Sequence, residues 1–379
     1  MSNQKTASSP KKRRFRLWHF LLAVLILAGI GFGLRHEAIQ RWKWAAIRMP
    51  DRMARVGGVW SVNTLARRLQ DAHKLRDVPT FLVAAQEVGL TEVQPGGYYL
   101  PPLAGPLDLA RAFKAGPTHL KVTFPEGFTA EQIAARLQRL GFVHAQDLLQ
   151  MAYPETGFSH LEGRLYPDTY LLRKTASAHV LAQTLEDRFT RVTNALPRPF
   201  PNLAGKPLTL LQLTILASIV EREARAPVDM PLVAGVLLNR LNTPMRLQVD
   251  ATVEYGLILQ ARAGQGPGRK TRLTDADLKL PSPFNTYLID GLPPEPICNP
   301  GAQALQAVAR PTWSNYLFYV YSPLLKRHRF AATFAEHQQN IRLAIAERQE
   351  LQAATLAALN PNTGAGIQLP PPAPAPTAK

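Results

Sequence analysis

The sequence contains very little cysteine. Cys298 is the only one among 379 residues. A single cysteine cannot form an intramolecular disulfide, and it cannot supply the several thiolates of a cysteine-built zinc site. We therefore interpret Cys298 as a small residue in a proline-rich loop.

Acidic residues are scarce relative to basic ones. The chain has 27 Asp and Glu against 44 Lys and Arg, which gives a formal net charge of +17 at pH 7. Such a surface suits an anionic partner: a nucleic acid, an anionic lipid surface or an acidic polymer. The same charge also fits a basic protein that is merely soluble, so motifs must identify the partner.

Several catalytic motifs are missing. The sequence has no HExxH of the helix-borne zinc proteases and no GxSxG nucleophile elbow. The fragment GKP is not a phosphate-binding loop, because Phe200 stands where its first glycine is needed. For the scattered histidines, such as His328 and His337, we expect structural roles or hydrogen bonds to a substrate. We predict no metal and no other cofactor.

The sequence does have one long apolar run, LWHFLLAVLILAGIGFGL at residues 17–34. As a helix, such a run spans about 27 Å at ~1.5 Å per residue, close to the thickness of a bilayer core. The basic cluster KKRRFR precedes it, so the positive-inside rule predicts a cytoplasmic N-terminus. A cleaved signal peptide is the alternative, but the cleavage site is poor. We expect a single-pass anchor in the cytoplasmic (inner) membrane, with the residues after Arg35 outside the cytoplasm.

The remaining pattern predicts an α+β protein. Ser61, for example, precedes apolar residues at helical spacing, as an N-cap does. The segment 246–256 is predicted to be a loop. Helices are predicted at 61–75, 80–90, 129–142, 178–195, 208–224, 231–241, 302–309 and 333–351, and strands within 95–102, 119–127, 316–322 and 328–331.

The helix predicted at 208–224 ends in LASIVEREA, which carries Glu221 and Glu223. At ~100° per residue the two carboxylates lie on opposite sides, and Glu221 projects over short side chains that include Thr214 and Ser218. A carboxyl group in such a groove loses hydration, which raises its pKa and lets it act as a general acid near neutral pH. An ordinary solvated helix end is the alternative.

Two further segments offer groups that could hold a sugar. In MRLQVDATVEYG, Gln248 and Asp250 alternate, so on an extended stretch they point the same way. In SPFNTY, Asn285 and Tyr287 offer an amide and a phenol, although a tight Pro-Asn turn explains this segment equally well. We predict substrate contacts for Gln248, Asp250, Asn285, Tyr287 and Ser218.

Together these segments resemble the endolytic murein transglycosylases, the MltG/YceG-like family. The resemblance covers about residues 60–350 and rests on LASIVEREA, LNRL, MRLQVDATVEYG, SPFNTY and GLPPEPICNPG in this order. It implies a lytic transglycosylase, a carbon–oxygen lyase, that cleaves peptidoglycan between N-acetylmuramic acid (MurNAc) and N-acetylglucosamine (GlcNAc) within nascent strands. The product would carry a 1,6-anhydroMurNAc end, and cleavage would terminate strand elongation.

The resemblance also implies roles for particular residues and partners. Glu221 would be the catalytic acid. Because Glu223 points away from Glu221 on a regular helix, we expect Glu223, like Asn239, to be structural or to support the residues that touch the substrate. The partners would be peptidoglycan glycan strands, the cytoplasmic membrane and penicillin-binding synthases, with no nucleic acid. One carboxyl group suffices for this reaction, since the muramic C6 hydroxyl attacks within its own sugar.

The resulting division of the chain has seven parts. They are a basic cytoplasmic tail 1–16, a transmembrane helix 17–34, a juxtamembrane linker 35–52, a small LysM-like α+β module 53–120, a connecting helical part 121–205, a mixed α+β catalytic domain 206–351 and a disordered Pro/Ala-rich tail 352–379.

Two other classes of function compete with this interpretation. A non-catalytic, membrane-anchored scaffold would bind glycan through its LysM-like module, with Glu221 as a plain helix end. A membrane-tethered nucleic-acid binder is suggested only by charge, and the sequence contains no recognisable module for it.

Overall fold

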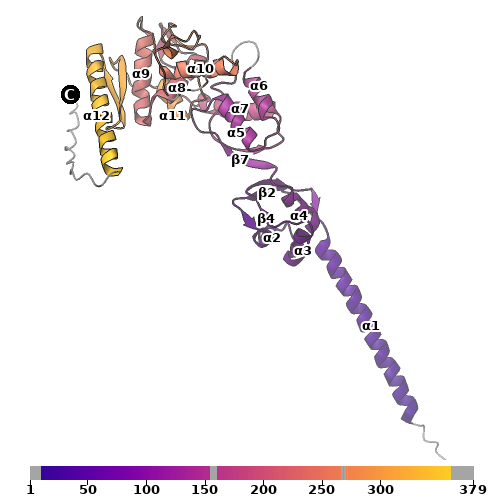
Figure 1. The fold of residues 1–379 in the computed structure, drawn as a ribbon. Coiled ribbons are helices and arrows are strands. Elements are labelled where there is room, and N and C mark those ends of the chain that lie inside the picture. Colours follow the sequence, from indigo (N-terminus) through magenta and orange to yellow (C-terminus); the bar gives the residue numbers. More distant parts are fainter. Residues whose placement is uncertain (1–9, 154–159, 266–267, 269, 271, 360–379) are drawn as a thin grey trace, which may run out of the picture. The chain divides into compact units, whose positions relative to one another are not determined.

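The computed structural model describes residues 10–153, 160–265, 268, 270 and 272–359. The chain forms two compact units (Figure 1). Unit 1 comprises Met1–Val122 and Tyr170–Thr175, and unit 2 comprises Thr123–Thr169 and Ala176–Lys379. Helices and strands occur in both, so the predicted mixed α+β class is confirmed. The identity of residues 53–120 as a LysM-like module stays a prediction.

Unit 1 contains short helices packed on small antiparallel sheets. Its main sheet has the order β2-β5-β7-β8, and two further pairs join β1 to β6 and β3 to β4. The elements are α1 (Pro10–Trp44), β1 (Ile47–Arg48), β2 (Met53–Val56), β3 (Trp60–Ser61), α2 (Val62–Asp71), α3 (Val78–Glu87), β4 (Glu92–Val93), β5 (Gly96–Tyr99), β6 (Leu103–Ala104), α4 (Pro106–Lys114), β7 (His119–Thr123) and β8 (Thr169–Arg173).

Helix α2 begins where the sequence predicts, α3 begins two residues before its predicted start, and α4 was not predicted. Ser61 caps α2 by accepting a hydrogen bond from the Thr64 N–H, and Asp77 caps α3 through the Thr80 N–H. The amphipathic face of α2 then buries Leu65 and Leu69 in the core of the unit.

Helix α1 contains the predicted membrane span. Its segment Trp18–Trp44 is long and apolar enough to cross a membrane, and none of it is buried. By length and composition it fits a single-pass anchor or a signal sequence. Within the predicted juxtamembrane linker, the chain stays helical up to Trp44. An ion pair between Arg41 and Glu37, one turn apart at 2.6 Å, favours this continuation.

Unit 2 is mostly helical with one substantial hairpin. Its elements are α5 (Ala130–Arg139), α6 (Ala145–Ala152), α7 (Ala178–Asn194), β9 (Asn202–Leu203), β10 (Lys206–Pro207), α8 (Leu210–Glu223), η1 (Pro227–Asp229), α9 (Met230–Leu241), α10 (Asp250–Arg262), η2 (Asp277–Lys279), α11 (Ala302–Ala309), β11 (Phe318–Ser322), β12 (Arg327–Ala331) and α12 (Phe334–Leu359).

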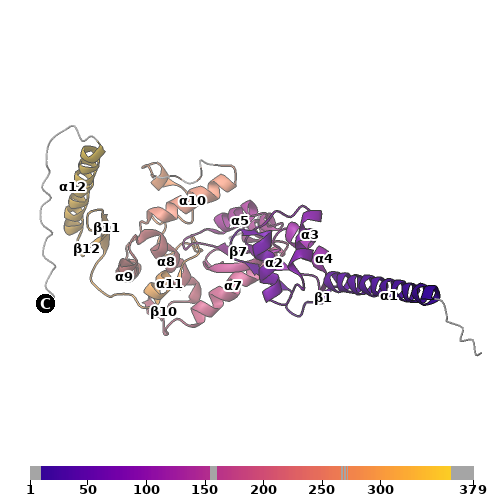
Figure 2. The same ribbon diagram turned by 90° about the horizontal axis from the view of Figure 1, so that it is seen from below.

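Helix α8 is the central helix of unit 2. Thr209 forms a capping box with Gln212 at its start, and every residue of 213–220 is buried. A helix that is buried on all sides needs partners all round, and α9 and α11 supply them (Figure 2). Residues 221–223 at its end are only partly buried, so the α8 C-terminus leads out of the core.

The β11–β12 hairpin packs against α12 (Figure 1). Its strands pair antiparallel, with Tyr319 opposite Phe330 and Tyr321 opposite His328. Both strands and the helix at 302–309 are confirmed from the sequence. The disordered tail predicted from 352 is wrong up to Leu359, which is the last residue of α12. The rest of that tail and residues 1–9 lie outside the described residues.

Candidate active site

Glu223, the last residue of α8, faces a cavity of about 930 Å³. The walls come from the end of α8, the first turns of α10, the β11–β12 hairpin and α12. Tyr319 on β11 donates its O–H to Glu223 Oε2 at 3.0 Å. Three segments far apart in the chain therefore meet around this carboxyl group.

The surroundings of Glu223 favour its protonated form. Burial raises the pKa of Glu223 to about 7, and the negative charges of Asp250 and Glu254 act in the same direction. The hydrogen bonds from Tyr319 and from the Ala251 N–H lower the pKa and so limit the rise. A carboxyl group with a pKa near neutrality can donate a proton and then accept one at the same pH.

Glu221 lies on the other side of α8, against the loop that begins α11. The Gly301 N–H donates to Glu221 Oε2 at 3.0 Å, and Gly301 is the N-cap of α11. Burial is the main cause that raises the pKa of Glu221, and the charge of Glu126 adds to it. Glu221 is not among the described residues that line the 930 Å³ cavity. The structure therefore does not bring it together with the predicted sugar-binding groups.

Gly301 packs closely against the side chain of Glu126. A Cβ built on Gly301 would collide with the side chain of Glu126, so no larger residue fits without a shift. Glu221 thus connects the end of α8 to the start of α11 through its hydrogen bond to Gly301, beside the exposed side chain of Glu126.

Three of the predicted substrate-binding residues do line the cavity: Gln248, Asp250 and Tyr287. Tyr287 donates its O–H to Asp250 Oδ1 at 2.6 Å. The extended stretch predicted for Gln248 and Asp250 is wrong, because α10 begins at Asp250. Gln248 instead has a φ of 50°, a left-handed conformation that is uncommon for residues other than glycine.

Asn285 and Ser218 are buried away from the cavity. The prediction that these two residues contact the substrate is therefore wrong. Asn285 Nδ2 donates to the carbonyl oxygens of Leu278 and Leu280, both at 2.9 Å. Ser218 donates to the Ile215 carbonyl and accepts the Ile297 N–H at 3.0 Å. Both side chains satisfy buried backbone groups that would otherwise lack partners.

A buried aspartate that the sequence did not single out holds the hairpin. Asp229 is fully buried, and Arg327 donates to its Oδ1 through Nε and Nη2 at 2.9 and 2.8 Å. The backbone N–H of His328 donates to Oδ2 at 2.7 Å, and the ring Nδ1 lies 3.1 Å from the same oxygen. This pairing fixes the His328 ring in the cavity wall. Asn239, expected to be structural, donates to the carbonyls of Ser314 and Tyr316 at the approach to β11.

Another carboxyl group, Glu162, has a pKa of about 7 because of burial. Its oxygens accept hydrogen bonds from the Ala130 N–H, from Asn299 Nδ2 and from the hydroxyls of Tyr153 and Tyr255. We assign Glu162 a structural role, because its oxygens are engaged by other groups of the protein and only 2% of the residue is exposed.

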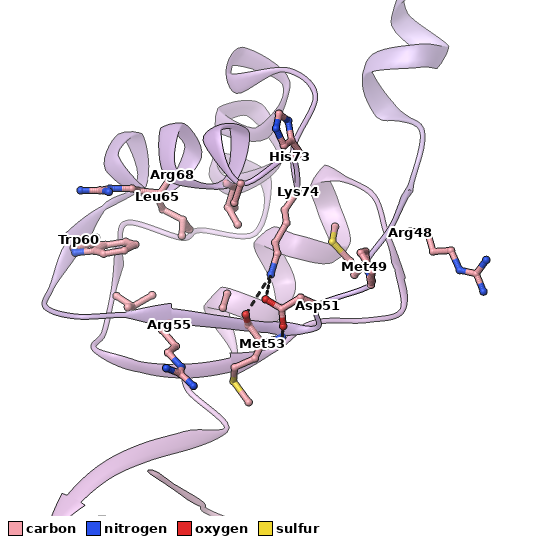
Figure 3. A pocket seen from close by; sticks show the side chains of 15 residues that line it. Arg48, Met49, Asp51, Met53, Arg55, Trp60, Leu65, Arg68, His73 and Lys74 are labelled. Atoms are coloured by element: carbon pink, nitrogen blue, oxygen red, sulfur yellow. Dashed lines mark hydrogen bonds and ion pairs between the residues drawn. The ribbon is translucent and has the colours of Figure 1, made fainter. Parts of the chain in front are cut away.

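Unit 1 has a cavity of its own, of about 940 Å³, between β2 and α2 (Figure 3). Lys74 Nζ donates to Asp51 Oδ2 at 3.3 Å and to the Met53 carbonyl at 3.2 Å. The Met53 N–H and Lys74 lower the pKa of Asp51. This carboxylate is therefore ionised at neutral pH and cannot serve as a general acid.

The described part of the chain contains no group of three or more His, Cys, Asp or Glu side chains arranged to hold a metal ion. His328 and His337 both line the Glu223 cavity. His328 faces Asp229, whereas His337 stacks on Phe318 with ring centroids 5.0 Å apart.

The sequence profile of the YceG-like family matches residues 56–343. The chain belongs to the YceG-like family. The matched range contains all the residues that line the Glu223 cavity except Arg348.

Relatives with established names are similar to this chain over part of their length. The endolytic murein transglycosylase of Streptococcus pneumoniae D39 is 25% identical over 315 residues, covering 74% of this chain and 56% of that protein. The endolytic murein transglycosylase of Bacillus subtilis 168 is 30% identical over 225 residues, covering 54% of this chain and 58% of that protein. The chain thus spans less than two thirds of either relative.

A solved crystal structure is also similar to this chain. It is that of a YceG-like protein from Listeria monocytogenes, which is 26% identical, with 76% of this chain and 98% of that chain covered and a TM-score of 0.49.

Proposed function

We propose that this chain is an endolytic lytic transglycosylase of peptidoglycan, which cleaves the MurNAc–GlcNAc bond inside glycan strands. One observation carries the proposal: Glu223 has a pKa of about 7 at the edge of a cavity of about 930 Å³ that is open to a ligand. The substrate class is supported by the two relatives that are named endolytic murein transglycosylases.

In the proposed reaction, protonated Glu223 donates its proton to the glycosidic oxygen, and the bond from that oxygen to C1 of MurNAc breaks. The C6 hydroxyl of the same MurNAc attacks C1, and the Glu223 carboxylate takes the proton that this hydroxyl loses. The product ends in 1,6-anhydroMurNAc, and Glu223 returns to its protonated state. Because the attack is intramolecular, its effective molarity is high and no positioned water is needed.

Glu223 takes the catalytic role that the sequence pattern predicted for Glu221. Both carboxyls are desolvated and both accept a backbone hydrogen bond, Glu221 from Gly301 and Glu223 from Ala251, but of the two only Glu223 lines the cavity. For Gln248, Asp250 and Tyr287 we propose contacts to the sugars. The Tyr287 hydrogen bond holds Asp250 in one orientation, which suits a group that must align a substrate hydroxyl.

We further propose that α1 anchors the enzyme with residues 1–16 in the cytoplasm and the residues after Arg35 outside it. The basic residues before the apolar run support this orientation. The same proposal includes nascent strands as the substrate and penicillin-binding synthases as partners, since a membrane-anchored enzyme meets strands where they are made. It also includes the assignment of residues 53–120 as a LysM-like module.

The decisive experiment is product analysis. The purified chain is incubated with isolated peptidoglycan, and the released fragments are analysed by mass spectrometry. We expect the wild type to release fragments with 1,6-anhydroMurNAc ends, and we expect the Glu223→Gln variant to release none. Reducing ends would indicate a hydrolase instead, and binding without any cleavage would indicate the non-catalytic scaffold.

A further inference from the structure

The Glu223 cavity is lined by more guanidinium groups than carboxyl groups. Its acidic residues are Glu223, Asp250 and Glu254. Its five arginines are Arg222, Arg225, Arg240, Arg272 and Arg348. Because Glu223 is partly protonated near pH 7, the cavity carries a net positive charge.

Two of the arginines are engaged by the protein itself. Arg222 forms an ion pair with Glu254 at 3.3 Å. Arg240 is buried, and it donates from Nε to the Leu317 carbonyl and from Nη1 to the Leu247 carbonyl, both at 2.6 Å. These two side chains are fixed as part of the wall.

The other three, Arg225, Arg272 and Arg348, form what we call the arginine rim. Within the described residues, none of them pairs with a carboxylate, and all three are exposed. They come from three separate places: the segment after α8, the loop before η2, and α12. The Arg225 guanidinium lies over the Tyr321 ring at 4.7 Å, which restrains its position.

Three unpaired positive charges around one cavity repel one another unless a ligand neutralises them. The N-acetylated sugars of a glycan backbone are uncharged, so they give no reason for this charge. In peptidoglycan the negative charges are the carboxylates of the short peptides attached to the lactyl groups of MurNAc. A guanidinium group matches a carboxylate with two parallel hydrogen bonds.

We infer that the arginine rim binds the carboxylates of the stem peptide, so that the substrate is a peptide-bearing strand. The inference rests on the proposed function. A pyrophosphate on a lipid-linked strand has similar charge but sits only at one end of the strand, whereas stem peptides recur along it. They are therefore present at any internal cleavage site.

The test uses soluble, lipid-free, uncrosslinked glycan strands of equal length in two forms, with the peptide carboxylates either free or amidated. The enzymes are the wild type, Arg225→Gln, Arg348→Gln and the double variant. Arg342→Gln is the matched control, since Arg342 is also exposed on α12 but does not line the cavity. KM and kcat are measured from anhydro products, and Kd is measured with each variant combined with Glu223→Gln.

On free-carboxylate strands we expect KM and Kd of the double variant to rise about tenfold, because a charge-assisted hydrogen bond is lost. We expect kcat to stay unchanged. On amidated strands the wild type should already bind about tenfold more weakly, and the variants should add nothing. Equal KM for both strand forms in the wild type overturns the inference, as does an equal effect of Arg342→Gln.

Failure of the proposed function is distinguishable from failure of the inference. If no anhydro product forms but the Glu223→Gln protein prefers free carboxylates and loses this preference with the rim variants, the peptide-binding rim stands and the catalytic proposal falls. Anhydro products formed equally from both strand forms give the reverse result.

Discussion

Glu221 and Glu223 stand two residues apart on α8, yet their surroundings differ completely. Burial raises the pKa of both carboxyl groups. Glu221 lies against Gly127 and accepts the Gly301 N–H, whereas Glu223 lines a cavity and accepts the Tyr319 hydroxyl and the Ala251 N–H. A raised pKa reports only that a group is desolvated. Access to open space decides whether its proton can reach a substrate.

The strongest test of the difference between Glu221 and Glu223 is to replace each carboxyl group in turn with an amide. Glu223→Gln should lower kcat by about 10²–10⁴-fold, because that is the usual contribution of a general acid–base group. Glu221→Gln should lower it less than about tenfold, since Gln keeps an oxygen to accept the Gly301 N–H. Both rates are measured as release of anhydro ends.

Circular dichroism and thermal melting check that both proteins are folded. The reverse order of effects, with Glu221→Gln the more damaging, would return the catalytic role to Glu221.

The hairpin wall that encloses the Glu223 side depends on Asp229. Asp229→Ala should destabilise the protein by about 1–3 kcal/mol, because it leaves the buried His328 N–H without its acceptor. Urea unfolding measures the change. The control is Asp290→Ala, which removes an exposed partner of Arg246 and should cost less than about 1 kcal/mol. Similar costs for the two variants would show that the buried pairing is not what holds the hairpin.

The desolvation of Glu223 should also appear in the pH dependence of stability. The pKa of this carboxyl group is about 7 in the folded protein, against 4.5 for an unperturbed glutamate, so the stability it contributes below the unfolded pKa is lost as pH rises towards 7. The stability of Glu223→Gln relative to the wild type should therefore increase between these two pH values, by up to about 3 kcal/mol. A difference that stays constant with pH would mean that Glu223 is hydrated.

The smallest expected effect concerns Tyr319. Its hydrogen bond lowers the pKa of Glu223, so Tyr319→Phe should raise that pKa and move the fall of kcat/KM to higher pH, by about one unit. Tyr321→Phe, on the same strand, keeps the ring beneath Arg225 and should leave the pH profile in place. A shift to lower pH in Tyr319→Phe would contradict the assigned hydrogen bond.

The parts of the fold that could be predicted from the sequence were those that depend on the local pattern of polar and apolar residues. The cap at Ser61, the helix at 302–309 and the strands of the hairpin follow from neighbouring residues. Asn285 and Ser218 were wrongly predicted to bind substrate, because a polar residue next to apolar ones can equally satisfy buried backbone groups. Tyr319 was overlooked, although strand alternation places it on the same side as Tyr321.

The sequence alone determined that Glu221 and Glu223 project from opposite sides of one helix, because an α-helix turns ~100° per residue whatever surrounds it. Only the tertiary structure decided which of those sides borders a cavity. Tyr319 lies 96 residues from Glu223, and Gly301 lies 80 residues from Glu221. Such contacts depend on how distant segments pack, and no local periodicity records that.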